Sequence, residues 1–140
     1  MTLREVVNML MDIAESQPAV NSVTEGSVYE NLNANPSINY YNVNISQTNH
    51  RSDLEADYWQ FNIFATDRLK DNDSNRLQVQ SNAIEILRNI IKSFLDITGC
   101  DLYDEVVFTP FTERFVDVCA GAYAQVRFRI PVEYQCSELY

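Results

Sequence analysis

The stretch AYAQVRFRIPV, residues 122–132, shows the clearest alternation of apolar and polar side chains in the sequence. Small or apolar residues occupy every second position, and the positions between them hold Tyr123, Gln125, Arg127 and Arg129. A period of two residues is that of a β-strand with one buried face and one wet face. Pro131 predicts that the strand ends there or lies at a sheet edge, because proline cannot donate to a strand ladder.

Two further alternating runs predict a long antiparallel hairpin. The first places apolar Tyr41, Val43 and Ile45 opposite a wet face of Asn42, Asn44 and Ser46; the second places Trp59, Phe61, Ile63 and Ala65 opposite Tyr58, Gln60 and Asn62. The polar segment QTNHRSDLEAD, residues 47–57, separates them and has no turn signature such as Asn-Gly. We therefore expect a long loop over residues 47–57 that projects away from the sheet.

Helical signals occur at both sides of this hairpin. Thr2 and Glu5 have capping-box spacing before an amphipathic run that stops ahead of Pro18. Residues 74–98 contain neither glycine nor proline, and Gly99 follows as a C-terminal cap. Apolar residues cover roughly 180° of this second helix, whereas one-sided packing requires about 100°. We expect it to contact the sheet and also either the first helix or a neighbouring subunit.

The order of these elements predicts an α+β fold, an antiparallel β-sheet with two α-helices packed on one face. Residues 20–33, VNSVTEGSVYENLN, have the spacing of a further strand around a turn at Gly26. A length of 140 residues suits one domain, residues 1–140, with a flexible C-terminal tail at about 134–140.

Charge and composition exclude several classes of function. Twenty acidic against ten basic residues leave a net charge of −10, which argues against a nucleic-acid-binding surface and would repel passing DNA. No run approaches the ~18 apolar residues of a membrane span. The N-terminal segment is too charged for a signal peptide. The three cysteines fit neither a disulfide framework nor a metal motif, so we expect free thiols in a reducing compartment.

No catalytic, cofactor-binding or metal-binding residues are predicted. The single histidine, His50, lies in the expected loop beside Arg51 and Asp53, where no rigid scaffold would orient a catalytic set. The DNDSN segment, residues 71–75, lacks the glycine and the distal glutamate of a calcium loop. Three separated glycines cannot form a phosphate-cradling loop. We expect a protein that is not an enzyme and needs no cofactor.

The segment FTPFTERF, residues 108–115, leaves two interpretations open. Phe108, Phe111 and Phe115 could fill the core around a turn bent by Pro110. Alternatively, the same rings and Arg114 could form an interface, because aromatic residues and arginine are enriched at association hot spots.

PFTERF at residues 110–115, Ala120-Gly121 and the strand ending at Pro131 together resemble a pattern in small neck and tail ring proteins of crAss-like and related tailed bacteriophages. Residues 20–30 also resemble the first strand and turn of that family. The aromatic residue that usually follows Ala-Gly is replaced here by Ala122, and Tyr123 comes next. In fold, these proteins are similar to tail-completion and tail-terminator proteins, which form closed rings around the DNA channel.

This resemblance implies a structural protein of the virion that joins head-proximal and tail components and is assembled in the host cytoplasm. Its partners would be further copies of itself and neighbouring neck or tail proteins, without sequence-specific nucleic-acid binding. The interface candidates are Phe108, Phe111, Arg114, Phe115, His50 and Arg51, and the channel-facing candidates are Asp53, Glu55 and Asp57. The alternative is a monomeric acidic binding module, an inhibitor or adaptor, which would not form rings.

Overall fold

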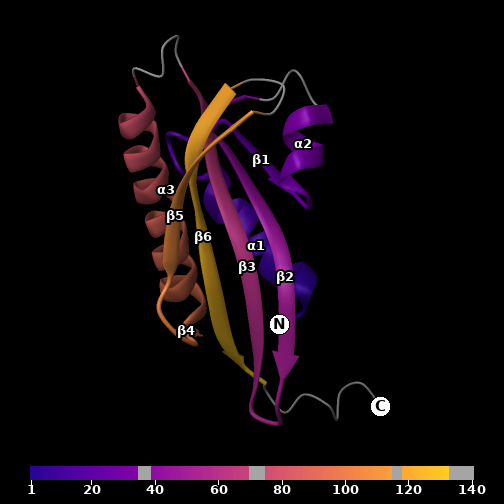
Figure 1. Cartoon of the computed structure of the whole chain (residues 1–140). Helices are drawn as coiled ribbons and strands as arrows, with labels where there is room; N and C mark the ends of the chain where they lie inside the picture. The colour runs from indigo at the N-terminus through magenta and orange to yellow at the C-terminus, as the bar shows by residue number, and fades with distance from the viewer. Residues whose placement is uncertain (35–38, 70–74, 115–117, 133–140) are drawn as a thin grey trace.

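A computed structural model describes residues 1–34, 39–69, 75–114 and 118–132. A sheet of six strands, most of them antiparallel, carries helices on both faces (Figure 1). The elements in chain order are α1 (Leu3–Glu15), β1 (Ser22–Glu25), α2 (Val28–Ala34), β2 (Asn42–Ser52), β3 (Ala56–Arg68), α3 (Arg76–Thr98), β4 (Asp101–Leu102), β5 (Val107–Arg114) and β6 (Val118–Pro131).

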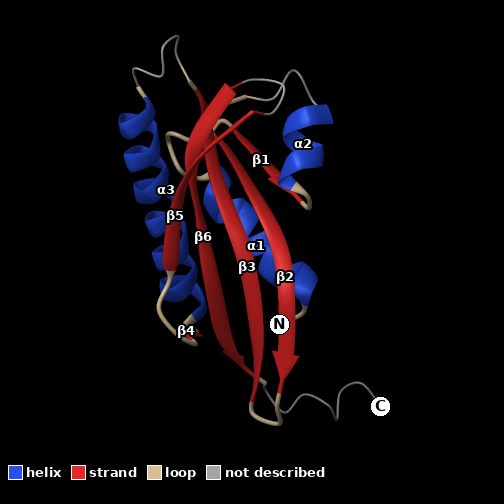
Figure 2. Cartoon of the chain, viewed as in Figure 1, coloured by secondary structure: helices blue, strands red, loops and turns tan. Residues whose placement is uncertain are grey.

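The long strands β2, β3 and β6 form the centre of the sheet (Figure 2). They pair antiparallel, with Ile63 of β3 lying between Ile45 of β2 and Ala124 of β6. β1 pairs parallel with the first part of β2, and α2 connects the two strands. On the far side of β6, β5 and β4 pair with different parts of the same strand, so the α+β class and the mainly antiparallel sheet are confirmed.

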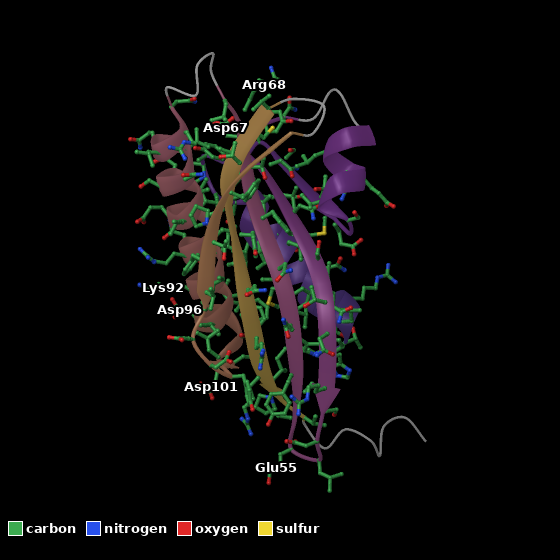
Figure 3. All side chains as sticks on the ribbon, viewed as in Figure 1. Glu55, Asp67, Arg68, Lys92, Asp96 and Asp101 are labelled. Carbon is green, nitrogen blue, oxygen red and sulfur yellow. The ribbon has the colours of Figure 1, made fainter. Side chains whose placement is uncertain are left out.

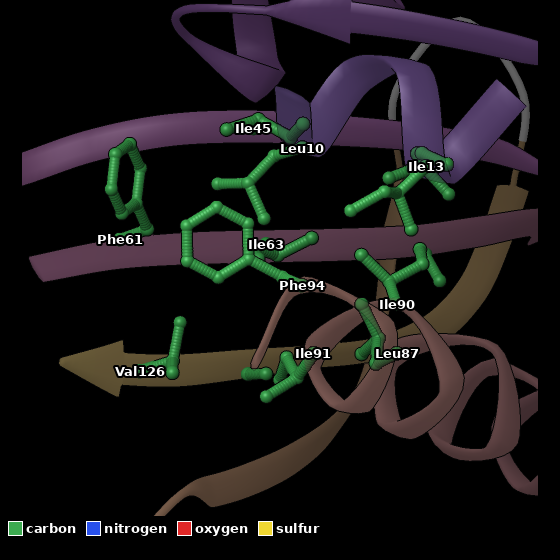
Figure 4. Close-up of a cluster of buried hydrophobic side chains, with 14 of the residues drawn as sticks. Leu10, Ile13, Ile45, Phe61, Ile63, Leu87, Ile90, Ile91, Phe94 and Val126 are labelled. Atoms are coloured by element: carbon green, nitrogen blue, oxygen red, sulfur yellow. The ribbon is translucent and has the colours of Figure 1, made fainter. Parts of the chain in front are cut away.

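α1 and α3 cover one face of the sheet and bury the main core (Figure 4). Alternate residues of the central strands point toward these helices. Phe94 of α3 and Phe128 of β6 are fully buried, with ring centroids 4.4 Å apart. Other fully buried side chains of this core are Val6, Leu10, Val43, Ile45, Phe61, Ile63, Leu87, Ile90 and Val126.

The wide apolar arc of α3 is used inside the chain. α3 packs against α1 as well as against β3, β5 and β6, which confirms the first helix as its second contact. Only Leu77 and Ile97, near its two ends, remain strongly exposed among its large apolar residues. The helix ends as predicted, since Gly99 takes a left-handed conformation with φ of 69°. The breadth of the arc is therefore no evidence for a neighbouring subunit.

A third helix, α2, lies on the opposite face, so the prediction of two helices on one face was incomplete. Val28 and Leu32 of α2 pack with Cys119, and Tyr40, Phe64 and Phe111 surround this smaller cluster. Residues 22–25 do form the expected strand, but the chain beyond Gly26 turns into helix. Seven residues of helix are too short to show a clear 3.6-residue period in the sequence.

The long loop predicted over residues 47–57 is wrong. β2 continues to Ser52 and β3 begins at Ala56, so only residues 53–55 form the turn. A β-bulge between Gln47 and Asn49 shifts the register, and pairing then resumes to Ser52 opposite Asp57. This end of β2 is polar because both of its faces are exposed, and cross-strand pairing makes it a strand nevertheless.

The remaining predictions, on the polar face of β2, the end of the last strand and the C-terminal tail, had different outcomes. The wet face predicted for β2 is wrong at its start, because Asn42 and Asn44 are fully buried beneath β1 and α2. Pro131 ends β6 as predicted, opposite Ala56. The tail predicted at residues 134–140 lies outside the described residues. No helix within the described ranges combines the length and the apolar character needed to cross a membrane.

Candidate functional site

The hairpin end of the sheet carries an open polar groove on the face opposite α1 and α3. α2 packs against β1, the start of β2 and the cluster around Cys119, Phe64 and Phe111, so the hairpin end of the same face is left uncovered by any described helix. The cavity measures about 280 Å³ and is lined by Asn49, Arg51, Ser52, Asp53, Tyr58, Gln60, Tyr103 and Arg127. Figure 3 labels two residues at this end of the molecule, Glu55 in the hairpin turn and Asp101 of β4.

Strand register builds the floor of the groove from two rows of side chains. In the outer row, Arg51 lies opposite Tyr58, and Tyr58 lies opposite Arg129. Asp101 of β4 completes that row on the far side of Arg129. The inner row is Asn49, Gln60 and Arg127. Side chains on paired positions point to the same face. The pairing of β2, β3 and β6 therefore brings three arginines, one from β2 and two from β6, to one surface.

Tyr103 forms one wall of the groove. Its backbone N–H donates to the Arg127 carbonyl at 2.9 Å, which holds the segment after β4 beside β6. The ring packs edge-on against Tyr58, with centroids 5.0 Å apart, and the Arg127 guanidinium lies 5.7 Å from the Tyr103 ring centroid. Arg127 also lies 3.6 Å from the Asp104 carboxylate, with both side chains about half exposed.

Asp53 organises the hairpin turn at the other end of the groove. Its Oδ1 accepts from the backbone N–H of Glu55 at 2.7 Å and of Ala56 at 2.8 Å, and its Oδ2 accepts from the Tyr58 hydroxyl at 3.0 Å. These hydrogen bonds, led by the Glu55 N–H, lower the pKa of Asp53. The Tyr58 hydroxyl, and then nearby acidic residues, raise the pKa of Arg129. The side chain of Arg51 makes no ion pair or hydrogen bond with the described residues.

We expect Asp53→Ala to lower the melting temperature at pH 7, because the turn loses its three hydrogen bonds. The folded-state pKa of Asp53 lies below the ordinary value of 3.8, so its contribution is present above that pH and fades as the pH falls through the folded pKa. Differential scanning calorimetry at pH 7 and pH 3 should show the gap to wild type narrowing. Glu55→Ala is the control, since only the backbone of Glu55 takes part in the turn; equal losses from both variants would contradict the role of Asp53.

The predicted aromatic segment forms a strand and is not a turn. Residues 107–114 are β5, and Phe108 and Phe111 pack on opposite faces of the sheet. Arg88 of α3 lies over the Phe108 ring at 5.7 Å, and Gln80 donates to the Phe111 carbonyl at 3.1 Å. The core-filling interpretation is thus confirmed for these two rings, and an interface role stays a prediction.

The side chains of two other interface candidates, Arg114 and Phe115, are outside the described part of the structure. Arg114 ends β5 opposite Val118. Phe115 falls outside the described residues altogether.

His50 and Asp57 lie on the helix side of the hairpin, away from the groove. The His50 ring stacks on Trp59, with centroids 3.8 Å apart, and its Nε2 lies 3.0 Å from Asp57 Oδ1. Asp57 borders a separate depression near Gly99, whereas Asp53 lines the groove. The three acidic residues predicted to face a channel therefore do not form one cluster.

Sequence reasoning missed most of this groove. Arg127 and Arg129 were predicted only as a wet strand face, and Tyr58 and Tyr103 were not singled out. Leu54, which is 91% exposed in the hairpin turn, was also missed. The available signal was that Tyr58, Gln60, Arg127 and Arg129 occupy polar positions of alternating strands, but only the register shows that these residues meet.

The groove offers hydrogen-bonding and charged side chains from arginine, tyrosine, asparagine, glutamine and aspartate. Within the described ranges, no group of three or more histidine, cysteine, aspartate or glutamate side chains could hold a metal ion. No protein-family model matches the chain, and no curated protein matches it.

Proposed function

We propose that this chain is a structural subunit that forms a homo-oligomeric ring in the neck or tail of a tailed bacteriophage. Most of the described residues that carry the family resemblance lie on the paired strands β5 and β6, and residues 20–30 lie on β1 and the start of α2. Residues 110–114 belong to β5, and Ala120, Gly121 and Pro131 belong to β6. The pair β5 and β6 forms one border of the sheet, which is a position suited to contact between subunits.

The observation that carries the proposal is that both borders of the sheet have open strand edges. β1 covers β2 only as far as Ile45, so residues 47–52 pair with β3 alone among the described strands. On the other side, β5 pairs with β6 alone among the described strands, and Gln80 of α3 donates to one of its carbonyls, that of Phe111. Open edges are templates for pairing with another chain. Contact between two different edges of identical subunits is heterologous, and such contacts close into a ring when the rotation permits.

Charge supports a conduit role for this ring. A net charge of −10 per subunit would make a channel wall that repels the DNA phosphates and lets DNA slide. In this proposal the chain has no catalytic role and joins head-proximal and tail components of the virion.

The hairpin end offers a contact to an adjacent layer of the assembly. β2 and β3 extend well beyond β1 and α2 (Figure 1). The turn at their end presents Leu54, a large apolar side chain that is 91% exposed. In this proposal a surface of the adjacent layer covers the Leu54 side chain, because burying it removes apolar area from water.

Light scattering on the purified chain, followed by negative-stain microscopy, tests this proposal. We expect particles of uniform mass that image as closed rings, and a tagged copy should co-purify with complete virions. A sharp monomer at every concentration in moderate salt, with no assembly on adding neck or tail components, would contradict the proposal. That outcome would favour the monomeric acidic binding module.

A further inference from the structure

We infer that the groove at the hairpin end binds the acidic corner formed by β1 and α2 of a second copy of this chain. This inference rests on the proposed function and adds a second pair of surfaces to the edge contact between subunits. The groove supplies arginine and tyrosine side chains, and the corner, defined as residues 22–34, supplies carboxylates. A ring requires two different, complementary patches on each subunit, and these surfaces are such a pair.

The groove has unused capacity to donate hydrogen bonds. Arg51 is exposed and makes no ion pair with any described residue, and the one ion pair of Arg127 within the described ranges is its 3.6 Å contact with Asp104. Asp53, an acidic residue that lines the groove, is already occupied by two backbone N–H groups and Tyr58. Asn49 and Gln60 add neutral donors to the floor. An incoming carboxylate would therefore meet guanidinium groups that lack strong partners.

The groove also has the composition of a binding hot spot. Arginine and tyrosine are enriched where protein interfaces gain most of their free energy. Here Tyr58 and Tyr103 hold each other edge-on, and Arg127 lies over Tyr103. These contacts order the side chains before any partner arrives, so less entropy is lost on binding.

The corner has the complementary charge. Residues 22–34 contain Glu25 and Glu30 and neither lysine nor arginine. Both glutamates are exposed, and neither makes an ion pair with the described residues. The Asn31 side chain donates to the Glu25 carbonyl at 2.8 Å, which fixes the end of β1 to α2. In a chain of charge −10, contact with the arginines of the groove would avoid the repulsion that this acidic corner meets at other surfaces.

A charge-swap experiment tests the contact on the full chain. The groove variant is Arg51→Glu with Arg127→Glu, and the corner variant is Glu25→Arg with Glu30→Arg. Analytical ultracentrifugation should show self-association weakened about tenfold or more in each variant alone, because each swap places like charges together. The chain that carries all four substitutions should recover most of the wild-type association.

The control variant is Arg4→Glu with Lys92→Glu, at exposed positions of α1 and α3, which changes the net charge as much as the groove variant does and should leave association near that of the wild type. Circular dichroism melting curves establish that every variant is folded. The inference is wrong if the groove variant associates as strongly as the wild type. It is also wrong if the chain with all four substitutions associates no more strongly than the groove variant or the corner variant. Rings that persist in the groove variant would leave the proposed function standing, whereas a wild type that never associates would overturn both.

A binding assay with a labelled 20-base-pair DNA duplex tests the alternative that the groove binds nucleic acid. We expect no binding that depends on Arg51 and Arg127, in keeping with the acidic surroundings of the groove. Duplex binding that is lost in the groove variant and unaffected in the corner variant would assign the groove to nucleic acid and overturn the inference.

Discussion

Gly121→Ala should lower the free energy of unfolding by about 3 kcal/mol. Gly121 lies in β6 between Thr66 of β3 and Phe111 of β5. A Cβ atom at this position would lie 1.9 Å from the carbonyl oxygen of Ala65 and 3.0 Å from its carbonyl carbon. Both are backbone atoms of a strand paired on its two sides, so they cannot move without disturbing the pairing of β3 with β2 or β6.

Urea unfolding measures this loss, with fluorescence of Trp59, the single tryptophan of the chain, as the probe. Gly99→Ala is the control, because no atom lies within 4 Å of a Cβ built there and the cost comes only from its φ of 69°. That cost should be about 1 kcal/mol. A loss for Gly121→Ala no greater than for Gly99→Ala would show that β3 and β6 do not approach so closely.

Asn44→Ala should lower the free energy of unfolding by about 3 kcal/mol, because several buried polar groups lose their partner together. Asn44 Oδ1 accepts from the Thr24 hydroxyl and from the Asn31 amide, both at 2.7 Å. Its Nδ2 donates to the Gly26 carbonyl at 2.9 Å and to the Ser46 hydroxyl at 3.1 Å. The side chain is fully buried and connects β1, α2 and β2.

Asn49→Ala is the matched control, because Asn49 is an exposed asparagine further along the same strand. Its effect on stability should stay within about 0.5 kcal/mol. Asn44→Asp should cost at least as much as Asn44→Ala at pH 7, because a fully buried carboxylate would face the Gly26 carbonyl oxygen in place of the amide donor. Equal midpoints for the Asn44 and Asn49 alanine variants in urea would contradict the role of the buried network.

Asn44 also shows where sequence reasoning reaches its limit. Alternation in residues 41–46 correctly predicted which side chains of β2 meet α1 and α3. It also predicted a wet opposite face, because asparagine is usually exposed. The structure buries Asn42 and Asn44 there, because β1 and α2 supply enough hydrogen-bond partners. Nothing local to β2 shows that such partners arrive from residues 22–31.

Periodicity and composition were enough to predict α1, α3, the strand cores and the α+β class. These features depend on neighbouring residues: a 3.6- or 2-residue repeat shows which side is buried, and Gly99 shows where α3 ends. The tight hairpin, the helix α2 and the groove were decided only by the tertiary structure. The groove joins parts of the chain that are distant in sequence. Three strands pair in one register and bring together Arg51, Tyr58 and Arg129, and a backbone hydrogen bond to β6 adds Tyr103. That register minimises the free energy of the whole sheet, so no short segment of the sequence could specify it.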